Sequence, residues 1–339
     1  MKYPFTGLYY YCLYLAKYLE LTNKDKNLFF YSRKSTEAVL PHSVVQQHSL
    51  HKFLLPPLKR FDIWHSTYQG TMYYPWRRNI KIVLTVHDLN FMYDDSKPEA
   101  KKKKYLQQLA KKVHRADYIV AISEFVLADL KQHIPLGNKP AKVIYNGCTL
   151  EEIEELTAPA ILPLHPFLFT VGTIVDKKNF HVLPRLLKGN EYQLLIGGIT
   201  NSEAYRQKII DEAYVLGVAD RVVFTGAISE NDKQWYLKNC LAFVFPSTAE
   251  GFGLPVIEAM HFGKPVFLSR FTSLPEIGGK DAFYFERYDA DYMVSMLERS
   301  LEHFNQNEGS VKMKERARQF SWMASAEQYH KIYNELLEM

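Results

Sequence analysis

Short apolar runs alternate with amphipathic stretches along the whole of this 339-residue chain. The runs have the length of buried strands, and the stretches between them carry apolar residues at helical spacing. Strands separated by helices predict parallel sheets of βαβ units, the doubly wound α/β class. The strands are expected at residues 28–31, 63–66, 80–86, 118–122, 142–145, 167–172, 192–196, 221–225, 241–245, 265–268 and 282–285.

One segment divides this pattern. Residues 157–166 contain three prolines and little periodicity, which predicts a linker. A first domain is expected at residues 1–156 and a second at 167–320, and a final helix within 321–339 is expected to pack back across the boundary. Ligands of doubly wound sheets bind beyond the carboxyl ends of the strands, so two facing sheets predict a cleft. The other helices are expected at residues 9–21, 99–115, 124–132, 203–216, 231–239, 254–262 and 289–304.

The start of the first domain departs from this scheme. A doubly wound domain begins with a central strand that leads into a glycine turn, but only six residues precede Gly7, and Pro4 interrupts them. A domain that lacked this first strand would expose apolar surface and unpaired ladder groups, which is costly. Either the natural start lies further upstream or the domain lacks the strand, and we expect a truncated start.

The composition excludes several classes of protein. With 47% apolar residues, the chain is not expected to be disordered. Cys12, Cys148 and Cys240 lie far apart, which argues against a disulfide framework or a cysteine zinc site. No stretch has the order of a signal peptide or the roughly 20 apolar residues of a membrane span. A cytoplasmic location is expected.

Charge is divided unevenly. Residues 1–150 carry 23 Lys and Arg against 11 Asp and Glu, whereas residues 151–339 carry 19 against 26. The first half is therefore expected to meet an anionic partner. The densest basic cluster, given at the end of this paragraph, lies on the helix expected at residues 99–115. A basic amphipathic helix of this kind can lie on an anionic membrane surface, although a solvated helix face explains the cluster equally well. Nucleic acid is not expected, because no RNA-binding signature, zinc finger or recognition helix is present. The densest cluster comprises Lys101, Lys102, Lys103, Lys104, Lys111, Lys112 and Arg115.

The most specific segment spans residues 245–260. An apolar strand gives way to a polar loop, in which Gly251 and Gly253 allow a tight turn into a helix. The first-turn N–H groups and the helix dipole favour an anion such as phosphate. Glu250 precedes this turn and Glu258 follows it, and carboxylates beside a phosphate site need hydroxyl partners. A phosphate core with polyols on both sides indicates a nucleotide sugar.

This segment resembles the E-x7-E motif of the retaining glycosyltransferases of family four, which have the GT-B architecture of two Rossmann-like domains. Glu250 and Glu258 match the two ends of the motif, and residues 273–282 match its usual continuation. The resemblance extends over nearly the whole chain. It implies a retaining, metal-independent hexosyltransferase whose second domain binds the donor and whose first binds the acceptor. A helix cap with a solvated glutamate is the alternative interpretation of the segment.

The resemblance also implies roles for individual donor-binding residues. Lys178 takes the position of the phosphate-binding lysine, beside Lys177, and Thr173 stands where some relatives have arginine. A lysine just past a strand end can neutralise charge on the departing nucleotide. Glu258 is expected on the ribose and Glu250 on the transferred sugar. The diphosphate is expected against the turn formed by Gly251, Phe252, Gly253 and Leu254.

A further loop follows the strand expected at 221–225. In relatives this loop holds the base, so Ile228 is expected to pack on it while Glu230 and Lys233 read its edge. A carboxylate can accept from the N1–H and N2–H of guanine, which slightly favours a GDP-sugar. Ser229 followed by Asp232 is equally consistent with a helix cap.

Two residues of the first domain complete the predicted site. His87, at the end of the strand expected at 80–86, resembles the family histidine near the reacting sugar, and it can donate to a sugar hydroxyl or receive the acceptor's proton. The catalytic residues implied are therefore His87, Lys178 and Glu250. Gly7 takes the place of the family's first glycine loop, but Tyr9 stands where many relatives have a second glycine.

One pattern points to metal chemistry. Asp289 and Asp291 form a D-x-D sequence, but they open a predicted helix, where acidic residues act as caps. No metal and no cofactor are expected. The predicted reaction moves a sugar from a nucleotide-diphosphate sugar to a lipid-linked or oligosaccharide acceptor of surface polysaccharide, such as lipopolysaccharide, at the inner face of the membrane. The alternatives are a non-catalytic GT-B subunit that binds a nucleotide sugar or lipid, and a sugar-nucleotide epimerase.

Overall fold

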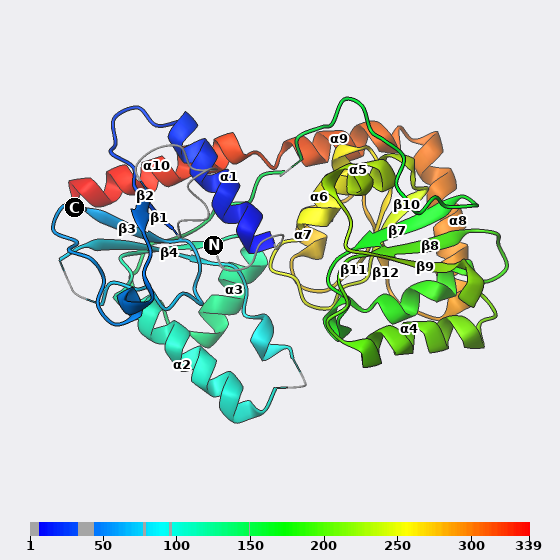
Figure 1. Cartoon of the computed structure of the whole chain (residues 1–339), viewed down its shortest axis with the longest axis horizontal. Helices are drawn as coiled ribbons and strands as arrows, with labels where there is room; N and C mark the ends of the chain where they lie inside the picture. Colours follow the sequence, from blue (N-terminus) through cyan, green and yellow to red (C-terminus); the bar gives the residue numbers. More distant parts are fainter. Residues whose placement is uncertain (1–6, 33–43, 77–78, 95–96, 149) are drawn as a thin grey trace. The chain divides into compact units, whose positions relative to one another are not determined.

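The computed structural model describes residues 7–32, 44–76, 79–94, 97–148 and 150–339. The chain divides into two compact units (Figure 1). The first combines Met1–Thr149 with Phe320–Met339, and the second is Leu150–Gln319. The segment 157–166, expected as a linker, therefore belongs to the second unit.

The first unit is built on a parallel four-stranded sheet of order β3-β4-β5-β6. A separate parallel pair is formed by β1 and β2. Strands β4 and β5 are buried almost throughout, as expected for strands covered on both faces. The strands are β1 (Phe30–Ser32), β2 (Val44–Gln46), β3 (Ile63–Ser66), β4 (Lys81–Val86), β5 (Tyr118–Ala121) and β6 (Ala141–Val143).

Helices cover both faces of this sheet. Helix α10 (Trp322–Glu338) returns to the first unit and packs against α1 (Gly7–Leu21), where the His330 ring donates to the Leu19 carbonyl at 3.0 Å. Figure 1 shows α1 and α10 on one side of the sheet and α2 (Glu99–Arg115) and α3 (Glu124–His133) on the other. The last segment of the chain thus completes the unit that its first segment begins.

The second unit has a parallel six-stranded sheet of order β12-β11-β10-β7-β8-β9. Strand β7 lies between β8 and β10, so the chain moves outward in one direction from β7 to β9 and in the other from β10 to β12. The strands are β7 (Phe167–Val171), β8 (Gln193–Gly197), β9 (Val222–Gly226), β10 (Ala242–Phe245), β11 (Val266–Ser269) and β12 (Phe283–Phe285). The helices are α4 (Glu203–Val215), α5 (Glu230–Asn239), α6 (Leu254–His261), α7 (Leu274–Gly278), α8 (Ala290–Gln306) and α9 (Gly309–Arg318).

The α/β class and the parallel sheets predicted from the sequence are confirmed. Each expected strand has a counterpart within two residues, whereas β2, α7 and α9 were not predicted. The first helix begins at Gly7 itself. The expectation of a missing first strand concerns Met1–Thr6, which lie outside the described residues.

Candidate active site

The donor residues predicted from the sequence gather at one edge of the second sheet. Lys178 belongs to the short 3-10 turn Asp176–Lys178 that follows β7, and Glu250 lies in the loop that follows β10. These strands are neighbours at the point where the strand order reverses. Carboxyl ends of strands at such a switch point form the usual ligand crevice of open α/β sheets.

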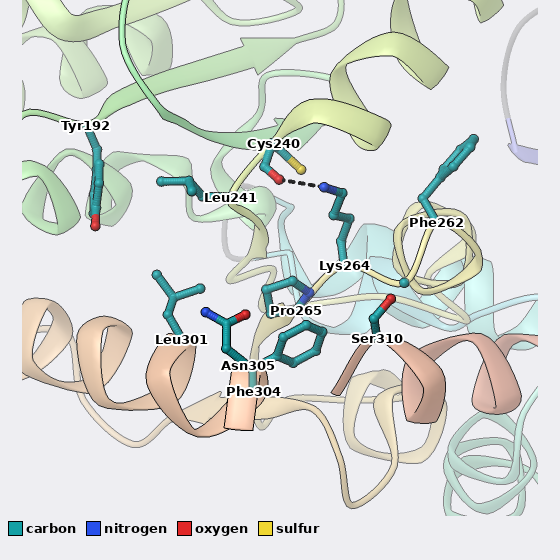
Figure 2. Close-up of a pocket in the computed structure, with 11 residues that line it drawn as sticks. Tyr192, Cys240, Leu241, Phe262, Lys264, Pro265, Leu301, Phe304, Asn305 and Ser310 are labelled. Atoms are coloured by element: carbon teal, nitrogen blue, oxygen red, sulfur yellow. Dashed lines mark hydrogen bonds between the residues drawn. The ribbon is translucent and has the colours of Figure 1, made fainter. Parts of the chain in front are cut away.

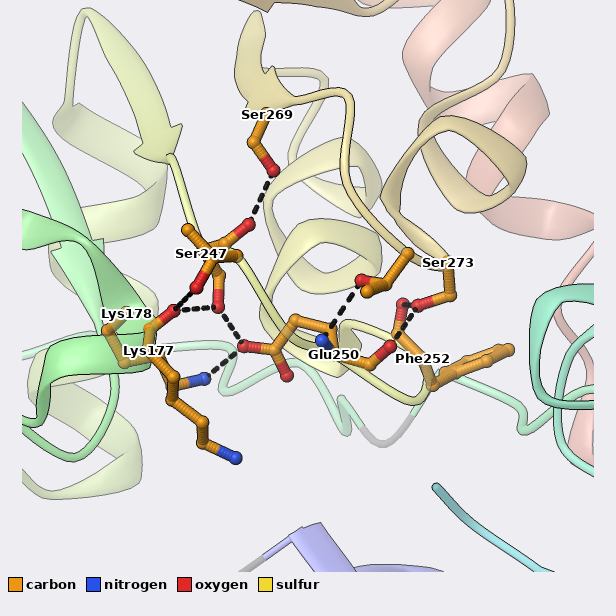
Figure 3. Close-up of polar contacts among 9 residues, drawn as sticks. Lys177, Lys178, Ser247, Glu250, Phe252, Ser269 and Ser273 are labelled. Atoms are coloured by element: carbon orange, nitrogen blue, oxygen red, sulfur yellow. Dashed lines mark hydrogen bonds and ion pairs between the residues drawn. The ribbon is translucent and has the colours of Figure 1, made fainter. Parts of the chain in front are cut away.

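Lys178 and Glu250 form an ion pair with Nζ and Oε1 2.5 Å apart (Figure 3). Each side chain is only 13% exposed. The Ser247 hydroxyl donates to the same carboxylate oxygen at 2.7 Å, and the Lys178 ammonium lies 4.7 Å from the centre of the Phe245 ring. Burial by itself raises the pKa of Glu250, but Lys178, Lys177 and Ser247 outweigh burial and hold this pKa below its usual value. Glu250 is therefore ionised at neutral pH.

Serine and threonine side chains fix the loop that carries Glu250. The Ser273 hydroxyl lies 3.0 Å from the carbonyl oxygens of both Glu250 and Phe252, which share its one hydrogen. The Thr272 hydroxyl accepts from the Glu250 N–H at 3.0 Å. On the other side, the Ser247 hydroxyl oxygen also lies 3.0 Å from the Lys177 carbonyl oxygen, which competes with Glu250 for its one hydrogen. The loop after β10 is thus bound to the loops after β7 and β11, a role that the sequence did not assign to these residues.

The same loop turns into α6 at Gly253, whose φ of 108° is in the region that favours glycine. A Cβ at Gly253 would lie 3.1 Å from the Leu274 side chain. Gly251 and Phe252 are buried, and Leu254 begins the helix. The structure thus places the predicted helix start beside Glu250, where its dipole favours an anion.

A second charged group lies one turn into α6. Glu258 is 5% exposed, and its Oε1 is 3.0 Å from Nζ of Lys233, which also contacts Glu230 at 3.0 Å. Burial alone lowers the pKa of Lys233, but the two carboxylates outweigh burial and raise it. Lys233 is therefore a permanent cation that bridges two acidic side chains. Ser229 caps α5 by accepting from the Asp232 N–H at 3.1 Å, so the cap interpretation is confirmed for Ser229.

The loops after β7 and β8 approach each other closely. A Cβ at Gly198, where φ is 130°, would lie 2.1 Å from the Gly172 carbonyl oxygen. Ile228 reaches the same place, because its Cδ1 lies 3.0 Å from where a Cβ of Gly197 would be. Ile228, which follows β9, and the half-buried Thr173, which follows β7, therefore belong to loops that lie on either side of the loop after β8.

In the first unit, His87 directly follows β4. Its ring Nε2 donates to the Thr67 carbonyl at 2.8 Å, and its backbone N–H donates to the Gln69 side chain at 3.0 Å. Burial lowers the pKa of His87, although Thr67 and Asp88 act in the opposite direction. The ring is therefore neutral at pH 7 with its hydrogen on Nε2, which leaves Nδ1 as the acceptor nitrogen.

The predicted basic surface separates into two groups. Lys112 is buried, and its ammonium donates to the carbonyls of Gln69 and Thr71 at 2.6 and 2.5 Å. Lys102 is buried beside Glu99, and Arg115 donates to the Ile80 carbonyl at 2.9 Å. These three are structural, which corrects their assignment to the surface. The exposed members are Lys101, Lys103, Lys104 and Lys111.

Two other features lie apart from the predicted site. Asp289 caps α8 by accepting from the Tyr292 N–H at 3.0 Å, which confirms the cap interpretation. Among the described residues no cluster of three or more His, Cys, Asp or Glu side chains could hold a metal ion. A cavity of about 490 Å³ is lined by Leu241 and Pro265, which precede β10 and β11, and by Leu301 and Phe304 of α8 (Figure 2). It therefore opens at the amino ends of these strands, opposite Lys178 and Glu250.

An ion pair at the switch point of one parallel α/β unit, with a second parallel α/β unit in the same chain, is the arrangement expected of a GT-B glycosyltransferase. Two family models match this chain: "Glycosyltransferase Family 4" at residues 28–152 and "Glycosyl transferases group 1" at residues 158–320. The chain belongs to glycosyltransferase family four and is a hexosyltransferase.

Individual relatives agree with this assignment. The O-antigen chain mannosyltransferase B of Escherichia coli is 25% identical over 95% of this chain and 94% of its own length. The serotype-specific mannosyltransferase WbdA of the same species is 30% identical to this chain. That alignment covers 58% of this chain and 26% of WbdA. The crystal structure of Anabaena HepE with UDP and glucose shares the fold, with a TM-score of 0.73 and 16% identity over 97% of this chain and 96% of that one. In the described part of the chain, no helix has the length and apolarity needed to cross a membrane.

Proposed function

We propose that this glycosyltransferase transfers mannose, with retention and without a metal, from a GDP-sugar to a lipid-linked or oligosaccharide acceptor in surface polysaccharide biosynthesis. The named relatives, two of which are O-antigen or serotype-specific mannosyltransferases, support the sugar and the process. The single observation that carries the proposal is the largely buried Lys178–Glu250 pair beside the start of α6.

The donor diphosphate binds between Lys178 and the start of α6. An ammonium group has three N–H donors, and Glu250 takes one of them, so Lys178 can contact a phosphate without losing its partner. The helix dipole adds a second source of positive potential. Glu250, kept ionised, accepts from a hydroxyl of the transferred sugar, and Glu258 accepts from the ribose.

The reaction breaks the bond between the anomeric carbon and the diphosphate and forms a bond from the acceptor oxygen to the same face of the sugar. The acceptor's proton passes to the departing phosphate oxygen. Negative charge accumulates on this leaving group, and Lys178 stabilises it in a site that is largely shielded from water. His87, neutral and with Nδ1 as its acceptor, receives a hydrogen bond from a sugar hydroxyl.

The base is read by Glu230 and Lys233 beside Ile228. A carboxylate held near a fixed cation suits the N1–H and N2–H donors of guanine, and the Lys233 bridge fixes Glu230 relative to Glu258. Thermal-shift measurements with GDP-, UDP-, ADP- and dTDP-sugars test this assignment, because a bound donor raises the melting temperature. GDP-mannose should give the largest shift, and a larger shift with another nucleotide would contradict the base assignment.

The decisive experiment measures nucleotide release from GDP-mannose in the presence of cell-derived lipid, with and without a chelator. Glu250→Gln should lower release by at least about 100-fold. The matched control is Glu212→Gln, which removes a carboxylate of the same unit that pairs with Arg185 at 2.6 Å outside the site. Full activity of Glu250→Gln, or loss of wild-type activity on chelation, would overturn the proposed mechanism.

A further inference from the structure

A closed group of buried hydroxyls lies inside the first unit. Tyr11 of α1 and Tyr329 of α10 join their hydroxyl oxygens at 2.8 Å, although 318 positions separate them in the chain. Thr85 of β4 contacts both, at 3.4 Å from Tyr11 and 3.1 Å from Tyr329. His65 of β3 joins Thr85 through Nε2 at 2.8 Å and joins Tyr333 of α10 through Nδ1 at 2.7 Å.

One order of donors fills every contact in this group. In this order Tyr11 donates to Thr85, the hydroxyl of Tyr329 donates to Tyr11, and that of Thr85 donates to Tyr329. The Thr85 contact with His65 must then use the hydrogen on Nε2, and Nδ1 accepts from Tyr333. The four hydroxyl hydrogens and the one on Nε2 of a neutral His65 thus fill the five hydrogen bonds of the group. Burial lowers the pKa of His65 to about 3, which agrees with a neutral ring.

The ring of Tyr11 connects this group to His87. The two rings meet edge to face, with centroids 4.5 Å apart and planes at 83°. Tyr11 is fully buried, so its ring closes one side of the His87 ring against water. The Thr67 carbonyl fixes Nε2 of His87, but one hydrogen bond leaves the ring free to turn about that direction. The contact with Tyr11 removes that freedom.

We propose that Tyr11 is a positioning residue for His87, and that Tyr329 of α10 holds Tyr11 in the orientation that this requires. The proposal rests on the role of His87 in the proposed function. The proposal gives α10 an indirect part in the reaction. This helix supplies the Tyr329 hydroxyl, which fixes Tyr11, and His87 packs against Tyr11. The titratable groups facing His87 are Tyr11, Tyr68, His65 and the adjacent Asp88.

Titration of the His87 ring by NMR tests the positioning directly. In Tyr11→Leu, water reaches the ring, and its pKa should rise toward the ordinary value of about 6.5. Tyr329→Phe keeps the ring of Tyr329 but removes the hydroxyl that holds Tyr11, so the same shift should occur to a smaller extent. Tyr333→Phe is the matched control, because it removes a hydroxyl from the same helix whose partner is His65 rather than Tyr11, and the His87 signals should stay in place.

Activity provides the second measurement. Tyr11→Leu should lower kcat about tenfold with little change in KM for the nucleotide sugar, because orientation rather than donor binding is lost. In a His87→Ala background, Tyr11→Leu should cost no further activity. If Tyr11→Leu does not fold, Tyr11→Phe and Tyr329→Phe take its place in both measurements.

Unchanged His87 signals in folded Tyr11→Leu, or an equal loss of kcat with and without His87, would overturn the positioning proposal. Full activity of His87→Ala alone would instead refute the proposed role of His87. The NMR titration still tests the positioning in that case, so the two failures can be told apart.

Discussion

The two units differ in the charge of the side chains that follow their central strands. After β7 and β10 of the second unit, Lys178 and Glu250 carry opposite charges that pair with each other and are largely shielded from water. After β4 of the first unit, His87 is held neutral among buried aromatic rings. A permanent charge suits a diphosphate, which carries charge throughout the reaction. A neutral ring suits a sugar hydroxyl, which does not.

The largest effect is expected from breaking the Lys178–Glu250 ion pair of the second unit. Lys178→Met leaves the Glu250 carboxylate buried without its main partner, so nucleotide release should fall at least about 100-fold, and the free energy of unfolding should fall by about 3–5 kcal/mol. Adding Glu250→Gln should restore most of the stability but none of the transfer. Urea unfolding and nucleotide release measure the two effects. If the single variant transfers normally, a permanent charge is not required.

The neutral histidines of the first unit predict that the free energy of unfolding falls in acid. A histidine whose pKa is lower in the folded state takes up protons more readily when unfolded, so its stabilising contribution is present above about pH 6.5 and is lost as pH falls. For His65 the loss should be about 1.4 kcal/mol per pH unit between about pH 6.5 and 3. His65→Gln keeps a donor and an acceptor but cannot titrate, so its unfolding free energy should fall less steeply. Parallel pH profiles for the two proteins would contradict this prediction.

Outside the strand ends, the densest cluster of basic residues in the first unit lies on α2. Replacing Lys101, Lys103, Lys104 and Lys111 by glutamine should weaken sedimentation with anionic vesicles by about 1 kcal/mol per lysine, and added salt should remove the difference. Lys112→Gln, which removes an inward-facing lysine, should lower stability and leave vesicle binding nearly unchanged. Equal vesicle binding by the fourfold variant and the wild type would rule out α2 as a lipid surface.

The smallest effect is expected from breaking an exposed ion pair, which serves as a comparison for the Lys178–Glu250 pair. Lys188 and Asp291 form an ion pair at 2.7 Å in the same unit, but their side chains are 51% and 84% exposed. Lys188→Met should therefore change the free energy of unfolding by less than about 0.5 kcal/mol and leave transfer unchanged. A loss comparable to that of Lys178→Met would show that burial does not explain the difference.

The candidate donor site could be predicted because its residues follow strand ends. Lys178 comes after β7 and Glu250 after β10, and parallel strands bring their carboxyl ends to one edge. The inward direction of Lys112 could not be predicted, because its partners are carbonyls of a distant loop. The pairing of Tyr11 with Tyr329 was equally hidden, since no local pattern relates residues at opposite ends of a chain. Strand β2 was missed because its two valines are the only apolar residues in a polar stretch.

The return of α10 has a consequence for how the chain is made. On the ribosome, the strands of the first unit emerge early, but the helix that packs against α1 emerges only after the whole second unit. The second unit is continuous in sequence, so its whole sheet is available before α10 is synthesised. The second unit should therefore be able to fold before the first unit, which is incomplete until α10 has been synthesised.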